Sequence, residues 1–130
     1  MDSKINNNIR RKNGWRLTQR ERPPLPVEVG GLNPQALAAL SPSQIERLPL
    51  TIGRDSVPLA EIFKLDGEPG PCLTFAGACE RLDGIGRNLA SGEILVEGDT
   101  GYETGCGQSG GEICVAGSVG DEASSRARVY

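Results

Sequence analysis

Ser91-Gly-Glu-Ile-Leu-Val-Glu-Gly-Asp-Thr-Gly101 and Gly110-Gly-Glu-Ile-Cys-Val-Ala-Gly-Ser-Val-Gly120 are two copies of one pattern, in which Gly92 corresponds to Gly111. A third, looser copy lies upstream, where Leu73-Thr-Phe-Ala-Gly77 takes the place of Ile94 to Gly98, with two extra residues in its turn. A Gly-rich repeat of about 19 residues, built from a short β-branched strand and glycine-bearing turns, is typical of a β-solenoid. The pattern therefore predicts a mainly β protein whose residues 72–123 form the first rungs of a right-handed, single-stranded β-helix.

The repeat has a simple physical reason. In the strand around Leu95, side chains alternate, so Ile94 and Val96 point to one side and Leu95 to the other. One coil cannot bury this pair alone, but stacked coils about 4.8 Å apart would set Ile94 over Ile113 and fill the interior. The same stacking sets Glu93 over Glu112. This like-charge pair is tolerable if it is solvated or matched by a partner's Arg or Lys, which hints at a docking surface.

The part before the repeat differs in character. Residues 1–14 are polar and read as a disordered basic tail, and residues 15–71 as an extended and helical leader. Pro23, Pro24 and Pro26 exclude a helix and suit an edge segment. Asn33 followed by Pro34, and Ser41 followed by Pro42 and Gln44, predict the starts of two short helices. Leu50–Ile52 reads as a strand, Pro58–Phe63 as a helical turn or a strand edge, and Gly67–Pro71 as a break.

Composition and charge limit the function. At 130 residues the chain suits one domain, and 11 of its 18 glycines fall between Gly84 and Gly120. Aromatic residues are scarce, at 4%, which argues against a protein that stacks nucleic-acid bases. The net charge of −3 combines +4 over residues 1–30 with −7 over residues 31–130. The basic arm could reach an anionic partner or serve only as a solubilising terminus.

Histidine is absent from the sequence, which excludes His-ligated metals, Ser-His-Asp and Cys-His nucleophiles and imidazole bases. The cysteines, Cys72, Cys79, Cys106 and Cys114, form no C-x-x-C pair and match no familiar zinc spacing. The sequence shows no apolar run as long as a membrane span and no signal-peptide pattern, so we expect a cytoplasmic protein that binds neither membrane nor nucleic acid.

Three features of the sequence suggest a chemical function, and each also has a structural interpretation. Gly105-Cys-Gly-Gln-Ser-Gly110 matches the dinucleotide fingerprint G-x-G-x-x-G, but it precedes a strand instead of opening a helix and reads as a corner of the solenoid. Cys106 and Cys114 could be a redox pair, although Cys114 takes the place of Leu95 and is more simply a small apolar filler. The acids beside turn glycines could bind a cation or cap turns: Asp83, Asp99 and Asp121. We predict no catalytic, cofactor-binding or metal-binding residue in this chain.

Together the leader and the rungs resemble the C subunits of formylmethanofuran dehydrogenase and of the formyltransferase/hydrolase complex. These belong to the GXGXG β-helix family that is named after the C-terminal domain of glutamate synthase. The likeness covers roughly residues 15–123. It is carried by Leu32-Asn-Pro34, Ser41–Leu50, Leu59–Phe63, Leu82–Gly86 and the two glycine rungs at 92–101 and 110–121. The rungs alone are less specific, because the glutamate synthase domain shares them.

The resemblance implies a non-catalytic, structural subunit of a one-carbon formyl-transfer complex. It implies amidohydrolase-like, formyltransferase and molybdopterin-domain-like partner subunits, methanofuran in the complex and, in a dehydrogenase, a tungsten or molybdenum pterin. The resemblance does not choose between dehydrogenase and hydrolase complexes. Two other interpretations stay open: a fragment of a glutamate synthase β-helix domain, and a free-standing β-helix interaction module.

The pattern departs from the family after Gly120-Asp121, where further turns and Gly-Gly pairs would follow. Ser124 stands where Gly105 predicts glycine, and Val129-Tyr130 where the repeat predicts Gly-Gly. We therefore expect a truncated N-terminal part of the family's subunit, with residues 124–130 as an atypical tail. An open, uncapped stack of this kind invites pairing at its edge.

Overall fold

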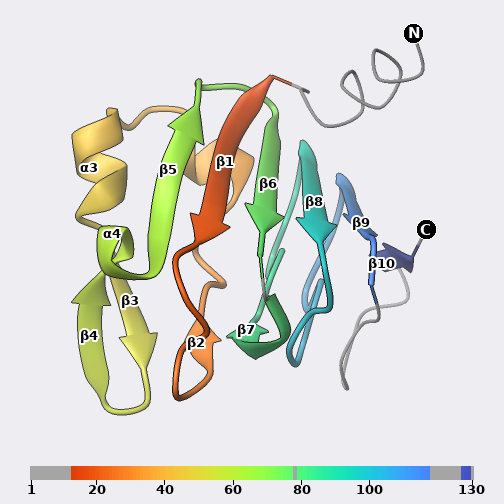
Figure 1. Ribbon diagram of the computed structural model, residues 1–130. Coiled ribbons are helices and arrows are strands. Elements are labelled where there is room, and N and C mark those ends of the chain that lie inside the picture. The colour runs from red at the N-terminus through yellow and green to blue at the C-terminus, as the bar shows by residue number, and fades with distance from the viewer. Residues whose placement is uncertain (1–12, 78, 118–126, 130) are drawn as a thin grey trace, which may run out of the picture.

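A computed structural model describes residues 13–77, 79–117 and 127–129 of the chain, with a mainly β fold (Figure 1). Its elements are β1 (Gly14–Gln19), β2 (Val27–Glu28), α2 (Pro34–Leu37), α3 (Pro42–Glu46), β3 (Pro49–Ile52), β4 (Asp55–Pro58), α4 (Leu59–Ile62), β5 (Phe63–Gly67), β6 (Cys72–Ala76), the 3-10 turn η1 (Cys79–Arg81), β7 (Leu82–Asp83), β8 (Glu93–Glu97), β9 (Glu112–Val115) and β10 (Ala127–Val129).

The strands form two sheets. The larger has the order β10-β9-β8-β6-β1-β5, and the smaller has the order β4-β3-β2-β7. In Figure 1 the green-to-blue strands β6, β8 and β9 lie side by side, with β1 and β5 beyond them and the β3–β4 hairpin below. The mainly β class is confirmed. The closure of the rungs into one right-handed β-helix stays a prediction.

The repeat forms a parallel ladder in the predicted register. Ile94 lies opposite Ile113 and Val96 opposite Val115, and Leu73 of the upstream copy lies opposite Ile94. All five of these side chains are fully buried. The constant spacing of the copies therefore aligns apolar side chains in the core, where each shields the next from water.

The turns stack as well as the strands. The N–H of Gly101 donates to the carbonyl of Leu82 at 3.0 Å, and the N–H of Gly105 donates to the carbonyl of Ile85 at 2.7 Å. Where the turn meets the next strand, the N–H of Glu112 donates to the carbonyl of Gly92 at 3.0 Å. Successive copies thus satisfy one another's backbone groups around the turn and not only along the strands.

The two extra residues of the upstream copy lie between β6 and β7. Leu73 and its strand partner Ile94 are separated by two more positions in the sequence than Leu82 and Gly101 are. The N–H of Gly101 donates a hydrogen bond to the carbonyl of Leu82. The 3-10 turn η1 lies in this interval, and the pairings before and after it are each in register. This confirms the predicted place of the extra residues.

A finding that the repeat did not predict concerns β1 and β2, which stack as a rung ahead of it. β1 pairs in parallel with β6, with Gly14 opposite Cys72 and Leu17 opposite Phe75. β2 pairs in parallel with β7, with Val27 opposite Leu82. The expectation that the extended, proline-bearing segment from Trp15 to Val29 lies at an edge is wrong for β1, which lies between β5 and β6. The prolines instead fall in the connection that follows β1.

The remaining leader covers this first rung. β5 pairs antiparallel with β1, and β3 pairs antiparallel with β2. Buried residues from both the leader and the rungs, including Leu17, Leu59 and Phe75, belong to one hydrophobic core. The antiparallel partners therefore protect strands that would otherwise be open edges of the parallel stack.

The predicted helix starts are confirmed with one difference. Ser41 and Gln44 form the expected capping box at the start of α3. Asn33 precedes α2 with Pro34 as its first residue, but the Asn33 side chain makes no cap hydrogen bond. Instead its Nδ2 donates to the carbonyl of Arg87 at 3.2 Å. Pro58–Phe63, for which two interpretations were open, contains the short helix α4 and leads into β5.

The corners require glycine at specific places. Gly86 and Gly105, which occupy equivalent positions of the repeat, both have φ of +74°, where other L residues are strained. A Cβ atom on Gly86 would lie 2.3 Å from Cδ1 of Ile113. At this corner the backbone conformation favours glycine, and an added Cβ would require the Ile113 side chain to shift.

The last strand breaks the period. In β10, Ala127 lies opposite Ile113 and Val129 opposite Val115, so fewer residues separate β10 from β9 than separate β9 from β8. The predicted atypical tail thus includes a strand that continues the parallel ladder beyond β9. Residues 118–126, which contain Asp121 and Ser124 of the sequence predictions, lie outside the described residues.

Candidate functional site

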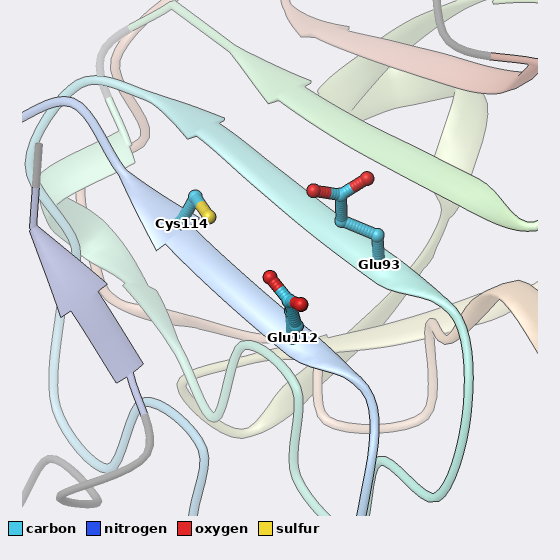
Figure 2. Close-up of side chains that lie close together, drawn as sticks. All are labelled: Glu93, Glu112 and Cys114. Carbon is cyan, nitrogen blue, oxygen red and sulfur yellow. The ribbon is translucent and has the colours of Figure 1, made fainter.

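The outer face of the larger sheet brings together three side chains able to bind a cation. Glu93 on β8 lies directly opposite Glu112 on β9, and Cys114 is two residues further along β9. Figure 2 shows the two carboxylates and the thiol on the same side of the strands, and their ligand atoms all lie within 4.8 Å of one another. Among the described residues, this is the one such group of acidic and cysteine side chains.

The chemistry of this group follows from its charges. Two carboxylates directly opposite each other repel, so a cation or a basic side chain beside them would be favoured. Carboxylate oxygen and thiolate sulfur are both ligands of Zn²⁺. Glu112 is exposed and Glu93 and Cys114 are half-buried. Three donors on the open face of a sheet form no enclosed cage, so the arrangement supplies cation-binding chemistry without the buried geometry of a structural metal centre.

The sequence predicted part of this group. The stacking of Glu93 over Glu112 is confirmed, and so is the register of Cys114 beside Leu95. The association of the thiol with the carboxylates was missed, because Cys114 was interpreted as a small apolar filler or as a redox partner of Cys106. The signal was present in the alternation of the strand, since Glu112 and Cys114 are two residues apart and must share a face.

Two of the other candidate features, Asp83 and the Gly105–Gly110 motif, have structural roles. Oδ1 of Asp83 accepts a hydrogen bond from the N–H of Tyr102 at 2.8 Å, so Asp83 ties one coil to the next at a turn. The Gly105–Gly110 motif lies in a turn and leads into strand β9, not into a helix, so the predicted context before a strand is confirmed. Cys106 and Cys114 are not joined by a disulfide. Asp99 lies in the turn after β8, and Asp121 is outside the described residues.

Cys79 is a second thiol with unusual chemistry. It is fully buried within η1 and belongs to the hydrophobic core. Burial, reinforced by the negative charges of Glu80 and Glu97, raises the pKa of this thiol to about 12. Cys79 is therefore protonated at neutral pH and is a poor nucleophile.

A cluster of ion pairs links the leader to two successive turns of the repeat. Arg87 lies between Glu28 and Glu103: its Nη1 is 3.2 Å from Oε1 of Glu28, and its Nη2 is 2.6 Å from Oε1 of Glu103. Oε1 of Glu28 also accepts a hydrogen bond from the N–H of Gly30 at 2.8 Å. These partly buried charges link the leader, the first copy and the second copy of the repeat, which is a structural role.

Taken together, the described residues form a mainly β protein of two sheets, in which the strands of the repeat pair in parallel. No helix in the described part of the chain is long and apolar enough to cross a membrane.

Comparison with known proteins agrees with the resemblance seen in the sequence. No protein-family model matches the chain. The chain is 30% identical over 96 residues to the C subunit of the tungsten-containing formylmethanofuran dehydrogenase 2 of Methanothermobacter marburgensis, covering 70% of this chain and 36% of the relative. It is 36% identical over 86 residues to the C subunit of the formyltransferase/hydrolase complex Fhc of Methylorubrum extorquens, covering 65% of this chain and 32% of the relative.

A solved structure is similar as well. One chain of the crystal structure of the formyltransferase/hydrolase complex (FhcABCD) from Methylorubrum extorquens in complex with methylofuran superposes with a TM-score of 0.70. The match has 27% identity and covers 81% of this chain and 47% of that chain. The chain is thus homologous to these C subunits over about 65–70% of its own length. It spans only about a third of the length of the two curated relatives.

Proposed function

We propose that this chain is a non-catalytic, structural subunit of a formylmethanofuran dehydrogenase or formyltransferase/hydrolase complex. The observation that carries the proposal is the combined match in sequence and fold to the C subunits of such complexes. The chemistry of the chain supports it. The sequence has no histidine, and the buried thiol of Cys79 is held protonated.

The proposed role has a structural basis in the stack of coils. The rungs of this chain are proposed to be the first coils of a right-handed β-helix, supported by parallel pairing of both β1 with β6 and β2 with β7. A stack of this kind offers long, rigid faces to neighbouring subunits. The partners proposed are amidohydrolase-like, formyltransferase and molybdopterin-domain-like subunits, in the cytoplasm. Methanofuran, and in a dehydrogenase a tungsten or molybdenum pterin, would be held by those partners.

The proposal is tested by assembly. The full chain is co-expressed with the formyltransferase and amidohydrolase-like subunits of the same organism, and the complex is isolated through a tag on one of these partners. We expect the chain to co-elute with both partners in a fixed ratio, with its intact mass verified by mass spectrometry. A chain that is folded, as judged by its circular dichroism, but elutes alone would refute the scaffold role. The matched control is an unrelated protein of similar size and charge.

A further inference from the structure

Two successive turns of the repeat have matching backbones and different side chains. We call residues 84–89 the first turn and residues 103–108 the second turn. Each is closed by two backbone hydrogen bonds of 2.9–3.1 Å at equivalent places. The N–H and carbonyl partners are Arg87 with Gly84 and Leu89 with Gly86 in the first turn, and Cys106 with Glu103 and Gln108 with Gly105 in the second. A difference in stability between the turns would therefore come from their side chains.

The second turn buries polar groups where the first buries apolar ones. Ile85 of the first turn is fully buried, and so is its counterpart Thr104 in the second. Among the described residues, the hydroxyl of Thr104 has no hydrogen-bond partner. Fully buried Leu89 corresponds to half-buried Gln108, whose Oε1 is also buried without a partner in the described part of the chain. Unpaired polar groups of this kind destabilise the conformation that buries them.

The second turn also contains a strained backbone. Glu103 has a φ of +61°, in the left-handed region, whereas its counterpart in the first turn is Gly84, with a φ of +77°. Glycine adopts this conformation freely, and a residue with a Cβ atom is strained in it. The first turn has one such residue, Asn88 at φ of +59°, but asparagine enters the left-handed region more readily than glutamate does. Strain therefore weighs more on the second turn.

One ion pair opposes this strain. Nη2 of Arg87 is 2.6 Å from Oε1 of Glu103, and Nη1 of Arg87 is 3.2 Å from Oε1 of Glu28. Glu28 is itself fixed, because its Oε1 accepts the N–H of Gly30 at 2.8 Å. Arg87 is thus held from the leader and reaches across to the second turn. The side chains of Arg87 and Glu103 are 33% and 46% exposed, so dissolved salt can screen their attraction.

We propose that the second turn is a movable segment of the stack, latched closed by the ion pair of Arg87 with Glu103. When the pair is broken, nothing offsets the strain at Glu103 or the burial of the Thr104 hydroxyl, and opening the turn relieves both. The first turn lacks these burdens and stays closed. The pairing of β8 with β9 lies outside the turn and is kept. Opening would then respond to ionic strength and to a charged partner that competes for Arg87 or Glu103. This inference does not rest on the proposed scaffold role.

Native-state hydrogen exchange of the full chain, followed by ¹⁵N NMR and corrected for intrinsic rates, tests the latch. We expect the second-turn amides of Cys106 and Gln108 to exchange at least roughly tenfold faster than the equivalent first-turn amides of Arg87 and Leu89. Raising the ionic strength from about 0.01 M to about 1 M shortens the screening length from about 30 Å to about 3 Å, and should speed second-turn exchange roughly fivefold. Equal protection of the two turns, or salt that accelerates both alike, would overturn the proposal.

Variants of Glu103 separate the latch from the strain. E103Q and E103A lose the ion pair and keep the strain, so their second-turn amides should exchange roughly fivefold faster, with no further response to salt. E103G loses the same pair but relieves the strain, so its exchange should stay within about twofold of the parent. If E103G opens as much as E103A, no strain is being held and the proposal fails.

A variant that tightens the turn gives an independent test. T104V keeps the shape of the side chain and removes the unpaired hydroxyl, so it should slow second-turn exchange roughly tenfold. E80Q is the control, because it removes the carboxylate of another ion pair, with Arg22, outside both turns, and should exchange as the parent does. Exchange in T104V at the rate of the parent, or an effect of E80Q equal to that of E103Q, would overturn the proposal.

Discussion

Arg16 on β1 and Glu97 on β8 form a two-pronged ion pair that crosses the intervening strand β6. Nη2 of Arg16 is 2.6 Å from Oε1 of Glu97, and Nη1 donates to Oε2 at 3.1 Å. The pair joins residues 81 positions apart in the sequence. The bond to Glu97, only partly opposed by burial, raises the pKa of Arg16, so the guanidinium stays charged throughout the accessible pH range. The pair therefore connects the leader to the second rung of the repeat.

We expect the pair to contribute about 1 kcal/mol to the coupling between leader and repeat, since both side chains are partly exposed and water screens their attraction. The measurement is a double-mutant cycle of R16M and E97Q, followed by urea denaturation. As a control, the cycle of K64M with D66N should give a coupling near zero, because that pair is 4.0 Å apart and more exposed. A coupling for Arg16 and Glu97 no larger than this control would contradict the prediction.

Gly86→Ala should destabilise the fold by about 1–3 kcal/mol, because alanine would be strained at φ of +74° and Cδ1 of Ile113 would have to move away from its Cβ. Gly31→Ala is the matched control, because a Cβ there has no neighbour within 4 Å, and its effect should stay within about 0.5 kcal/mol. Thermal and urea unfolding followed by circular dichroism would measure both. Equal stability of the two variants would show that the corner is not as tight as described.

Ile94→Ala should cost about 3 kcal/mol of unfolding free energy, because it opens a cavity in the centre of the stack between Leu73 and Ile113. The conservative Ile94→Val should cost only about 1 kcal/mol. Leu25→Ala, at a half-exposed side chain, should change stability by less than about 0.5 kcal/mol. Chemical denaturation gives all three values. A loss for Ile94→Ala as small as that for Leu25→Ala would argue against the stacked core.

Cys79 should resist alkylation by iodoacetamide at pH 8 in the folded protein, whereas the exposed Cys106 should react readily. Both should react in 6 M guanidinium chloride, a concentration on the order of that which unfolds even very stable domains. Site-resolved mass spectrometry distinguishes the two thiols. Labelling of Cys79 in the folded state at the rate of Cys106 would mean that the core opens or that Cys79 is not buried.

The same thiol predicts a dependence of stability on alkaline pH. The pKa of Cys79 is raised from 9.0 to about 12 on folding, so the unfolded chain loses this proton first as the pH rises. The resulting stabilisation is complete below pH 9 and is lost between pH 9 and pH 12. At pH 10 the parent should therefore have lost about 1 kcal/mol more than Cys79→Ala, relative to pH 8. Parallel pH dependences of the two proteins would contradict the assignment.

The repeat was the part of the fold most open to prediction. The strand register of Ile94 with Ile113 and the stacking of Glu93 on Glu112 follow from a period that every coil must share. The capping box of Ser41 with Gln44 was equally predictable, because the two residues are close in sequence and their hydrogen bonds involve no other part of the chain. Interactions of this local or periodic kind are encoded in spacing alone.

Contacts between distant, non-repeating segments could not be predicted from residue spacing. The leader strand β1 has no glycine pattern to mark it as a rung, yet it pairs in parallel with β6 at the other end of the leader. Its place depends on which apolar face fits the open end of the stack, and that choice is made by packing and not by local preference. The side chain of Asn33 was predicted to cap α2 but donates to Arg87, for the same reason.

The sequence by itself thus determined the parallel ladder, its register and the glycine corners, because apolar side chains at equal spacing can be buried only by lying over one another. Only the tertiary structure decided that the leader supplies the preceding rung and its antiparallel cover. It also decided that the Cys114 thiol lies beside Glu93 and Glu112, and that Arg87 lies between Glu28 and Glu103. These arrangements bring together residues that the sequence repeat does not relate to one another. Their geometry is therefore set only when the whole chain has folded around its core.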